Sequence, residues 1–289
     1  MSTEFSIVTI VKHRTQQLSN LLSSIERSSV IPKEVVIVWM TSPSDESLLS
    51  SEHFDIQHCF TTHSELPIAK ARNRGFEACT TAKIIYLDVD CICPATLLQE
   101  MTAPLVNGKV TTANITDLPC KTEEVSESVL QGLAAIPVQA PKELPFVHFD
   151  ATAFAITSDD FDRLGGFDTD YDGYGFSDVD FAMRCSQAGL TLVNTGRHVF
   201  KQFHMHFNPP LNHLCDLVAN AELFKQKWSC YPFCDYFEKF AELGYVNADY
   251  EQAGIRVTRL ASEEELDEFF IEQPCEEQPE VAEEMRQTA

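Results

Sequence analysis

Positive charge is scarce in this 289-residue sequence, which has 21 Lys and Arg residues against 44 Asp and Glu and a formal net charge of −23. Nucleic acids and anionic lipids are bound by basic surfaces, so the sequence argues against both as partners. Part of the acidic excess is local, because the chain is dense in Glu from Ser262 onward. We expect residues 262–289 to form a solvated or disordered acidic tail rather than a site.

Long apolar runs are also missing, and no stretch approaches the ~20 residues that span a bilayer. The N-terminal MSTEFSIVTIVK does not follow the secretory signal pattern, because Glu4 precedes its apolar run and Lys12 follows it. The ten cysteines lack Cys and His partners at zinc-finger spacing, which indicates reduced thiols. We therefore expect a cytoplasmic protein without a transmembrane segment, a state that permits peripheral association with a membrane through partners.

The N-terminal half has a regular alternation of segments. Apolar runs rich in β-branched residues predict strands, and apolar residues at helical spacing predict helices. Strands are expected over residues 5–11, 34–40, 55–62 and 83–90, and helices over 15–28, 66–82 and 94–105. This order predicts an α/β fold with a mostly parallel sheet and helices on both faces. Ligands bind such sheets at the carboxyl ends of the strands.

The second half is less regular. Residues 117–145 are rich in Pro, Ser and Glu and are expected to form a flexible loop or lid between the halves 1–116 and 146–261. Further along, strands are expected over 146–157 and 191–195, helices over 158–168 and 176–190, and a helical extension over 210–244.

Two carboxylates follow the fourth predicted strand directly, in the stretch IIYLDVDCIC. Side chains two residues apart on a strand point to the same side, so Asp88 and Asp90 are expected to be neighbours. Like charges at the edge of an apolar core are costly unless a cation lies between them. Carboxylate oxygens suit Mg²⁺ or Mn²⁺, which keep open positions for substrate phosphates. The alternative is a pair of solvated loop acids, because D-x-D is frequent by chance.

A second polar group lies in GGFDTDYDGYGFSDVDFAMR, residues 165–184. A helix is expected to begin near Ser177, with Ser177 and Asp180 at capping-box spacing and therefore structural. Asp178 then lies in the first helical turn, where the helix dipole favours an ionised carboxylate. Such a carboxylate can accept a proton from a substrate hydroxyl if it faces a pocket. Otherwise it is a solvated surface acid.

A third group is HMHFNPP, residues 204–210. In an extended chain His204 and His206 share one side, and either can complete a metal site with the two carboxylates. At least one of the pair is expected only to pack against the neighbouring phenylalanines. His198 is a further candidate ligand.

Together these segments resemble family 2 inverting glycosyltransferases with the GT-A fold. The resemblance lies in SIVTIVKHRTQQLSNLLSSI and IAKARNRGFEACTTAKIIYLDVDCICP. In addition, GGFDTDYDGYGFSDVDFAMRC is similar to the C-terminal module of galactosyltransferases and N-acetylgalactosaminyltransferases. The A-R-N-x-G before the D-x-D and the G-G-F-D after it make the set specific. The resemblance implies a GT-A fold with a C-terminal helical extension.

The resemblance also implies roles for individual residues. Asp88 and Asp90 match the D-x-D carboxylates that hold Mn²⁺ or Mg²⁺ on the diphosphate of a nucleotide sugar. Asp178 matches the carboxylate that deprotonates the acceptor hydroxyl. The remaining matches are Arg72 and Asn73 beside the nucleotide, Thr9 and Val11 where the first strand meets the base, and His204 or His206 as a further metal ligand.

Two positions depart from the family pattern. Trp39, Met40 and Thr41 stand where an Asp for the nucleobase is usual, so a UDP-sugar donor of the galactose or N-acetylgalactosamine kind is only a preference. Ser177 replaces the Glu that often precedes the catalytic Asp, which can change how the donor sugar or acceptor is held.

The sequence thus predicts an inverting, metal-dependent glycosyltransferase that moves a sugar from a nucleotide-sugar donor to a hydroxyl of a glycan or other acceptor. Two alternatives remain open. Haloacid-dehalogenase-type phosphatases also follow a strand with D-x-D, but they place it near the N-terminus and add a later G-D-x-x-x-D that this sequence lacks. A non-catalytic sugar-nucleotide-binding homologue would keep the fold without the activity.

Overall fold

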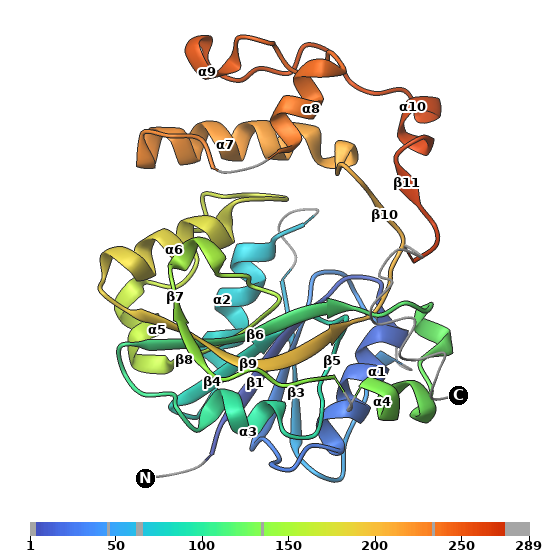
Figure 1. Ribbon diagram of the computed structural model, residues 1–289, viewed down its shortest axis with the longest axis vertical. Helices are drawn as coiled ribbons and strands as arrows, with labels where there is room; N and C mark the ends of the chain where they lie inside the picture. Colours follow the sequence, from blue (N-terminus) through green and yellow to red (C-terminus); the bar gives the residue numbers. More distant parts are fainter. Residues whose placement is uncertain (1–3, 45–46, 62–65, 134–135, 233–234, 275–289) are drawn as a thin grey trace.

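The computed structural model describes residues 4–44, 47–61, 66–133, 136–232 and 235–274. In these residues the main feature is a nine-stranded sheet in the order β3-β2-β1-β4-β8-β6-β9-β5, with β7 paired to β9 (Figure 1). The strands predicted in the N-terminal half are β1 (Ser6–Val11), β2 (Glu34–Trp39), β3 (Asp55–Phe60) and β4 (Lys83–Leu87). They pair in parallel, as the alternating pattern predicted.

The rest of the sheet is mixed. β8 (Ala153–Thr157) is antiparallel to β4 and to β6 (Lys109–Asp117), whereas β6 and β9 (Thr191–Lys201) are parallel. The short strands β5 (Cys91–Ile92) and β7 (Lys142–Leu144) are antiparallel to β9. β6 was not predicted, because its sequence KVTTANITD buries threonines where an apolar run would mark a strand.

Helices cover both faces of the sheet (Figure 1). α1 (Thr15–Glu26) and α3 (Leu97–Thr102) contribute to the apolar core on one face. α2 (Ile68–Ala78), α5 (Ser158–Leu164) and α6 (Ser177–Gln187) contribute to the core on the other face. The helices therefore follow the predicted segments, with ends a few residues shorter. Within the described residues, no helix combines the length and the apolar character needed to cross a bilayer.

The C-terminal extension is a group of helices with an apolar core of its own, in the upper part of Figure 1. It contains α7 (Leu214–Trp228), α8 (Tyr236–Glu242) and α9 (Tyr250–Ala253). Tyr171 and Phe176, from the segment before α6, belong to the same core. This shared packing joins the extension to the sheet-bearing part of the protein.

One strand prediction and one loop prediction differ from the structure. Residues 146–148, expected to begin a strand, form the short 3-10 helix η3 (Phe146–His148), and β8 begins only at Ala153. The segment 117–145 contains, besides β7, the 3-10 helix η2 (Thr122–Glu124) and α4 (Glu127–Leu133). Leu133 is buried in a small cluster with Leu118, which explains why regular structure forms in a segment of weak periodicity.

The predicted disorder from Ser262 onward is wrong for the first part of the tail. Residues in this stretch form α10 (Glu263–Asp267) and β11 (Phe270–Ile271). A capping box between Ser262 and Glu265 begins the helix, and β10 (His206–Phe207) pairs with the strand. These contacts order a segment whose composition alone indicates solvation. Residues 275–289 lie outside the described residues.

Candidate active site

A cavity of about 1050 Å³ lies where the carboxyl ends of β1 and β4 approach the C-terminal extension. Its lining comes from segments far apart in the sequence, including α2 and residues 88–90, 174–179 and 201–208. Parallel strands bring their carboxyl ends to one edge of the sheet, and this edge is where ligands bind in α/β proteins. The cavity therefore occupies the position that the strand order predicted.

Asp88 and Asp90 both line the cavity, directly after β4. Asp90 is 1% exposed, and its Oδ1 has no hydrogen-bond partner among the described residues. Burial, and then the charge of Asp90, raise the pKa of Asp88 to about 6, while burial also raises the pKa of Asp90. A buried carboxylate pair with an unpaired oxygen is unfavourable alone and favours a bound cation.

These residues fit a divalent cation that is shared between the protein and a substrate. In the part of the chain that the structure describes, no three His, Cys, Asp or Glu side chains form a complete metal centre. Mg²⁺, unlike structural zinc, is commonly held by one or two carboxylates together with substrate phosphates. Asp88 and the unpaired oxygen of Asp90 could form a partial ligand set of this kind.

Tyr86 holds the carboxylate of Asp88 in one orientation. Its hydroxyl donates a hydrogen bond to Oδ1 of Asp88 at 2.7 Å, and its ring is fully buried in β4. The guanidinium of Arg72 lies 5.0 Å from the centroid of this ring. Tyr86 stands two residues before Asp88 on the same side of the chain, yet we did not assign it from the sequence. Partners of this kind fix the orientation of metal ligands.

Replacing Tyr86 with Phe is expected to weaken Mn²⁺ binding about tenfold, because loss of an orienting partner typically costs 10–100-fold in metal affinity. The ring, and with it the Arg72 contact, is retained. Electron paramagnetic resonance of free Mn²⁺ measures the affinity directly. Tyr171→Phe is the matched control, since this buried hydroxyl donates to Asp180, 3.4 Å away and outside the cavity lining. Equal affinity in both variants would contradict the role of Tyr86.

Of the two candidate histidines, His204 contacts the carboxylate pair. Its Nε2 lies 3.4 Å from Oδ2 of Asp90. Burial, and then the charge of Arg14, lower the pKa of His204 to about 4, so the ring is neutral at pH 7 and this contact is not an ion pair. A neutral imidazole is the form that binds metals. His206 also lines the cavity but is exposed, and its ring centroid is 5.4 Å from that of His204.

Asp178 lines the same cavity from the first turn of α6, which begins at Ser177 as predicted. The predicted capping box is wrong, because the N-cap is Phe176 in a left-handed conformation, and no side-chain capping bond forms among the described residues. Asp180 is nevertheless structural. Its fully buried carboxylate has four partners, which are Tyr171, Arg184, Lys227 and Trp228.

Arg72 lies near both acidic groups of the cavity. It is 7% exposed, and its guanidinium is sandwiched between the rings of Tyr86 and Phe167, 5.0 Å from each centroid. Burial alone lowers the pKa of Arg72, but acidic neighbours that include Asp88 and Asp178 raise it overall. The predicted A-R-N arginine is therefore a buried positive charge on the cavity wall.

The cavity lining, as far as the described residues form it, lacks four other predicted residues: Thr9, Val11, Asn73 and His198. Thr9 and Val11 are fully buried, on the face of β1 opposite Ile10, because successive side chains alternate between faces. The prediction that the side chains of Thr9 and Val11 contact a bound base is therefore wrong for this cavity. His198 instead hydrogen-bonds the Thr116 hydroxyl at 2.9 Å.

Asn73 has a structural role in place of the predicted contact with a nucleotide. Its Nδ2 donates to the carbonyl of Phe167 at 2.8 Å, and its Oδ1 accepts from the Phe167 N–H at 2.7 Å. A Cβ on Gly166 would lie 2.7 Å from the same Oδ1, so this approach requires glycine. The A-R-N asparagine thus ties α2 to the G-G-F-D loop that leads toward Asp178.

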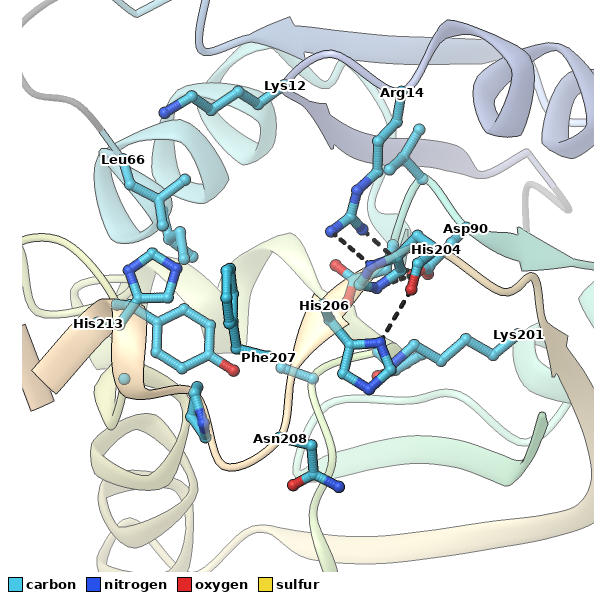
Figure 2. Close-up of a pocket in the computed structure, with 18 of the residues that line it drawn as sticks. Lys12, Arg14, Leu66, Asp90, Lys201, His204, His206, Phe207, Asn208 and His213 are labelled. Atoms are coloured by element: carbon cyan, nitrogen blue, oxygen red, sulfur yellow. Dashed lines mark hydrogen bonds and ion pairs between the residues drawn. The ribbon is translucent and has the colours of Figure 1, made fainter. Parts of the chain in front are cut away.

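Three lining cations were missed in the sequence: Lys12, Arg14 and Lys201 (Figure 2). Arg14 Nη1 lies 3.3 Å from Oδ2 of Asp90. Burial lowers the pKa of Lys201, but Asp90 and Asp88 raise it above its usual value overall. Lys12 and Arg14 could have been found because they directly follow β1, whereas Lys201 ends a strand more than a hundred residues from Asp88. In so acidic a chain, this gathering of positive charge suits an anionic ligand.

A sheet of this topology, with a carboxylate pair after β4 and an acid at a helix start in one cavity, defines a GT-A type of glycosyltransferase. The chain belongs to glycosyl transferase family 2, whose family model matches residues 6–153. A second model, described as the N-terminal domain of galactosyltransferase, matches residues 143–207. Both matches confirm the resemblance that the motifs indicated. A search of curated proteins finds no significant relative.

Solved structures share the fold at low sequence identity. GalNAc-T7 with UDP, GalNAc and Mn²⁺ is 15% identical with a TM-score of 0.55, over 83% of this chain and 54% of that one. S. aureus TarS 1–349 is 12% identical with a TM-score of 0.54, over 86% and 75% of the two chains. The mannosyltransferase PcManGT from Pyrobaculum calidifontis, in complex with GDP-Man and Mn²⁺, is 15% identical with a TM-score of 0.55, over 87% and 70%. At these identities the likeness shows the GT-A fold alone.

Proposed function

We propose that this protein is a metal-dependent, inverting glycosyltransferase that moves a sugar from a nucleotide-sugar donor to a hydroxyl of a glycan or other acceptor. The observation that carries the proposal is the cavity in which the carboxylates of Asp88 and Asp90 meet Asp178 and a set of buried or half-buried cations. A carboxylate pair suits a metal–diphosphate, and a separate acid suits the acceptor hydroxyl.

The donor diphosphate is held by charge. Asp88, Asp90 and His204 would hold a Mn²⁺ or Mg²⁺ ion, which when bound neutralises the diphosphate and stabilises the leaving nucleoside diphosphate. Arg14 and Lys201, which flank the carboxylates, balance the remaining negative charge (Figure 2). Such groups are fixed before the reaction, so they stabilise developing charge without reorganising.

Asp178 accepts the proton of the acceptor hydroxyl as that oxygen attacks the anomeric carbon. The bond to the diphosphate breaks on the opposite side, so the anomeric configuration inverts. Asp178 lies in the first turn of α6, where the positive end of the helix dipole attracts a negative charge. The buried guanidinium of Arg72 lies on the same cavity wall, and the charges of Asp88 and Asp178 help to raise its pKa.

A UDP-sugar of the galactose or N-acetylgalactosamine kind is our preferred donor. The galactosyltransferase-type match over residues 143–207 and the UDP in the GalNAc-T7 structure support this choice. The GDP-Man in PcManGT shows that the fold also accepts another base. In this chain Met40 lines the cavity near Ile10 and Ile68, so an apolar wall stands where the family usually has an Asp. The segment 117–145 begins with residues 117–119 on the cavity lining, and we propose it as a lid.

A thermal-shift panel of nucleotide sugars, with and without Mn²⁺, tests the proposal. We expect one donor to raise the melting temperature only when Mn²⁺ is present, since a ligand at 100 times its Kd stabilises by about 2.7 kcal/mol. The absence of any metal-dependent shift would contradict the proposal. Release of nucleoside diphosphate separates the enzyme from a non-catalytic homologue, and a colorimetric phosphatase assay tests the remaining alternative.

A further inference from the structure

The last described part of the chain, residues 262–274, forms one wall of the candidate active site. Ile271 and Pro274 line the cavity together with His204 and His206. In Figure 1 this segment runs from α10, beside the C-terminal extension, down along β10. From its Glu-rich composition we expected only a tail here, yet its apolar residues reach the cavity in which we propose that the donor binds.

Strand pairing joins this segment to the histidine-bearing strand. β11 pairs antiparallel with β10, with His206 opposite Ile271 and Phe207 opposite Phe270. The rings of Phe207 and Phe270 are 5.0 Å apart, and the N–H of Asn208 donates to the carbonyl of Phe269 at 2.9 Å. This two-stranded sheet is separate from the main sheet. Within the described residues, β10 therefore pairs with β11 and with no strand of the main sheet.

The other end of the segment is anchored on the C-terminal extension. Leu266 and Phe269 pack against its apolar core. Glu265 completes the capping box with Ser262, and both of its carboxylate oxygens lie 2.9 Å from Nη1 of Arg259. The segment thus connects the helical core at one end to β10 at the other.

We propose that residues 262–274 are a clasp that positions residues 204–208 in the active site and closes that side of the donor cavity. A two-residue strand is short, and without β11 the backbone groups of β10 lose their partners and are left to water. His204 would then no longer be held beside Asp90. Phe270 and Ile271 are positioning residues in this scheme. The donor part of the proposal rests on the proposed function.

Phe270→Ala tests the clasp in the full-length protein. Loss of the ring contact with Phe207 is expected to speed amide hydrogen exchange at residues 204–208 about tenfold in the ligand-free protein, because local opening becomes easier. The affinity for UDP with Mn²⁺, measured by calorimetry, is expected to fall by about the same factor while the melting temperature changes little. Phe270→Asp, which adds a charge opposite Phe207, should enlarge both effects. Leu260→Ala is the matched control, because Leu260 is apolar, close in sequence and 66% exposed.

The two readouts separate the clasp from the proposed function. Faster exchange together with weaker UDP binding supports the clasp. Unchanged exchange, or faster exchange with unchanged UDP affinity, overturns it. If the wild-type protein does not bind UDP with Mn²⁺, the UDP preference in the proposed function fails instead, and exchange at residues 204–208 alone then decides for or against the clasp.

Discussion

Asp178→Asn is expected to lower the rate of sugar transfer by about 10²–10⁴-fold, the usual contribution of a general base. The amide has nearly the shape of the carboxylate but cannot accept the acceptor proton. Because Asp178 stands on α6, apart in sequence from the carboxylate pair after β4, binding of UDP with Mn²⁺ is expected to remain within a few-fold of wild type. The measurements are kcat with the donor found by thermal shift, and UDP affinity by calorimetry.

Asp162→Asn is the matched control for this variant. Asp162 is also a helical aspartate, on α5, but it is exposed and lies outside the cavity lining. It should transfer sugar at the wild-type rate. If Asp178→Asn turned over at a near-normal rate, the general base would have to be another group. If it lost UDP binding as well, Asp178 would hold the donor rather than activate the acceptor.

The second large effect is expected for Asp90→Asn. This carboxylate is 1% exposed and its Oδ1 is unpaired among the described residues, so it offers a bound cation a free, buried ligand atom. Loss of a direct ligand should cost at least as much as loss of an orienting partner, and we expect Mn²⁺ affinity to fall about 100-fold or more. The Mn²⁺-dependent thermal shift with the donor should then disappear.

The metal-free protein gives this variant a second, independent readout. Burial raises the pKa of Asp90, which means that the fold disfavours its charged form. A neutral amide removes that cost, so the metal-free melting temperature of Asp90→Asn should be no lower than that of wild type. Asp55→Asn, at an exposed position of β3, is the control and should change neither property. Wild-type Mn²⁺ affinity in Asp90→Asn would place the cation elsewhere.

Much of the fold could be predicted because its signals are local. The apolar runs of β1, β2 and β4, and the apolar residues at helical spacing in α1, mark the ends of these elements to within a few residues. The position of Asp88 and Asp90 follows from the strand before them, and that of Asp178 from the helix start after the glycine-rich loop. Each of these inferences needs only neighbouring residues, since strand and helix periodicity is a property of the local chain.

Predictions failed more often where they depended on which face of the sheet a side chain occupies or on which group it hydrogen-bonds. Thr9 and Val11 were placed beside the base, but the strand turns those side chains away from the cavity toward the helix α1 side of the sheet. Asn73 was assigned to the nucleotide, yet both its amide nitrogen and its amide oxygen bond the backbone of Phe167. The register of a strand and the partner of an amide are set by packing across the whole domain, which a motif does not encode.

By itself the sequence determined the family, the alternation of strands and helices and the two acidic motifs. Only the tertiary structure decided that Lys201 and Arg14 flank those acids, that Tyr86 orients one of them, and that the Glu-rich C-terminal stretch forms a wall of the cavity. The physical reason is the separation along the sequence of the residues that interact. Hydrophobic periodicity acts over a few residues, whereas a binding site is assembled from groups that meet only after the chain has folded.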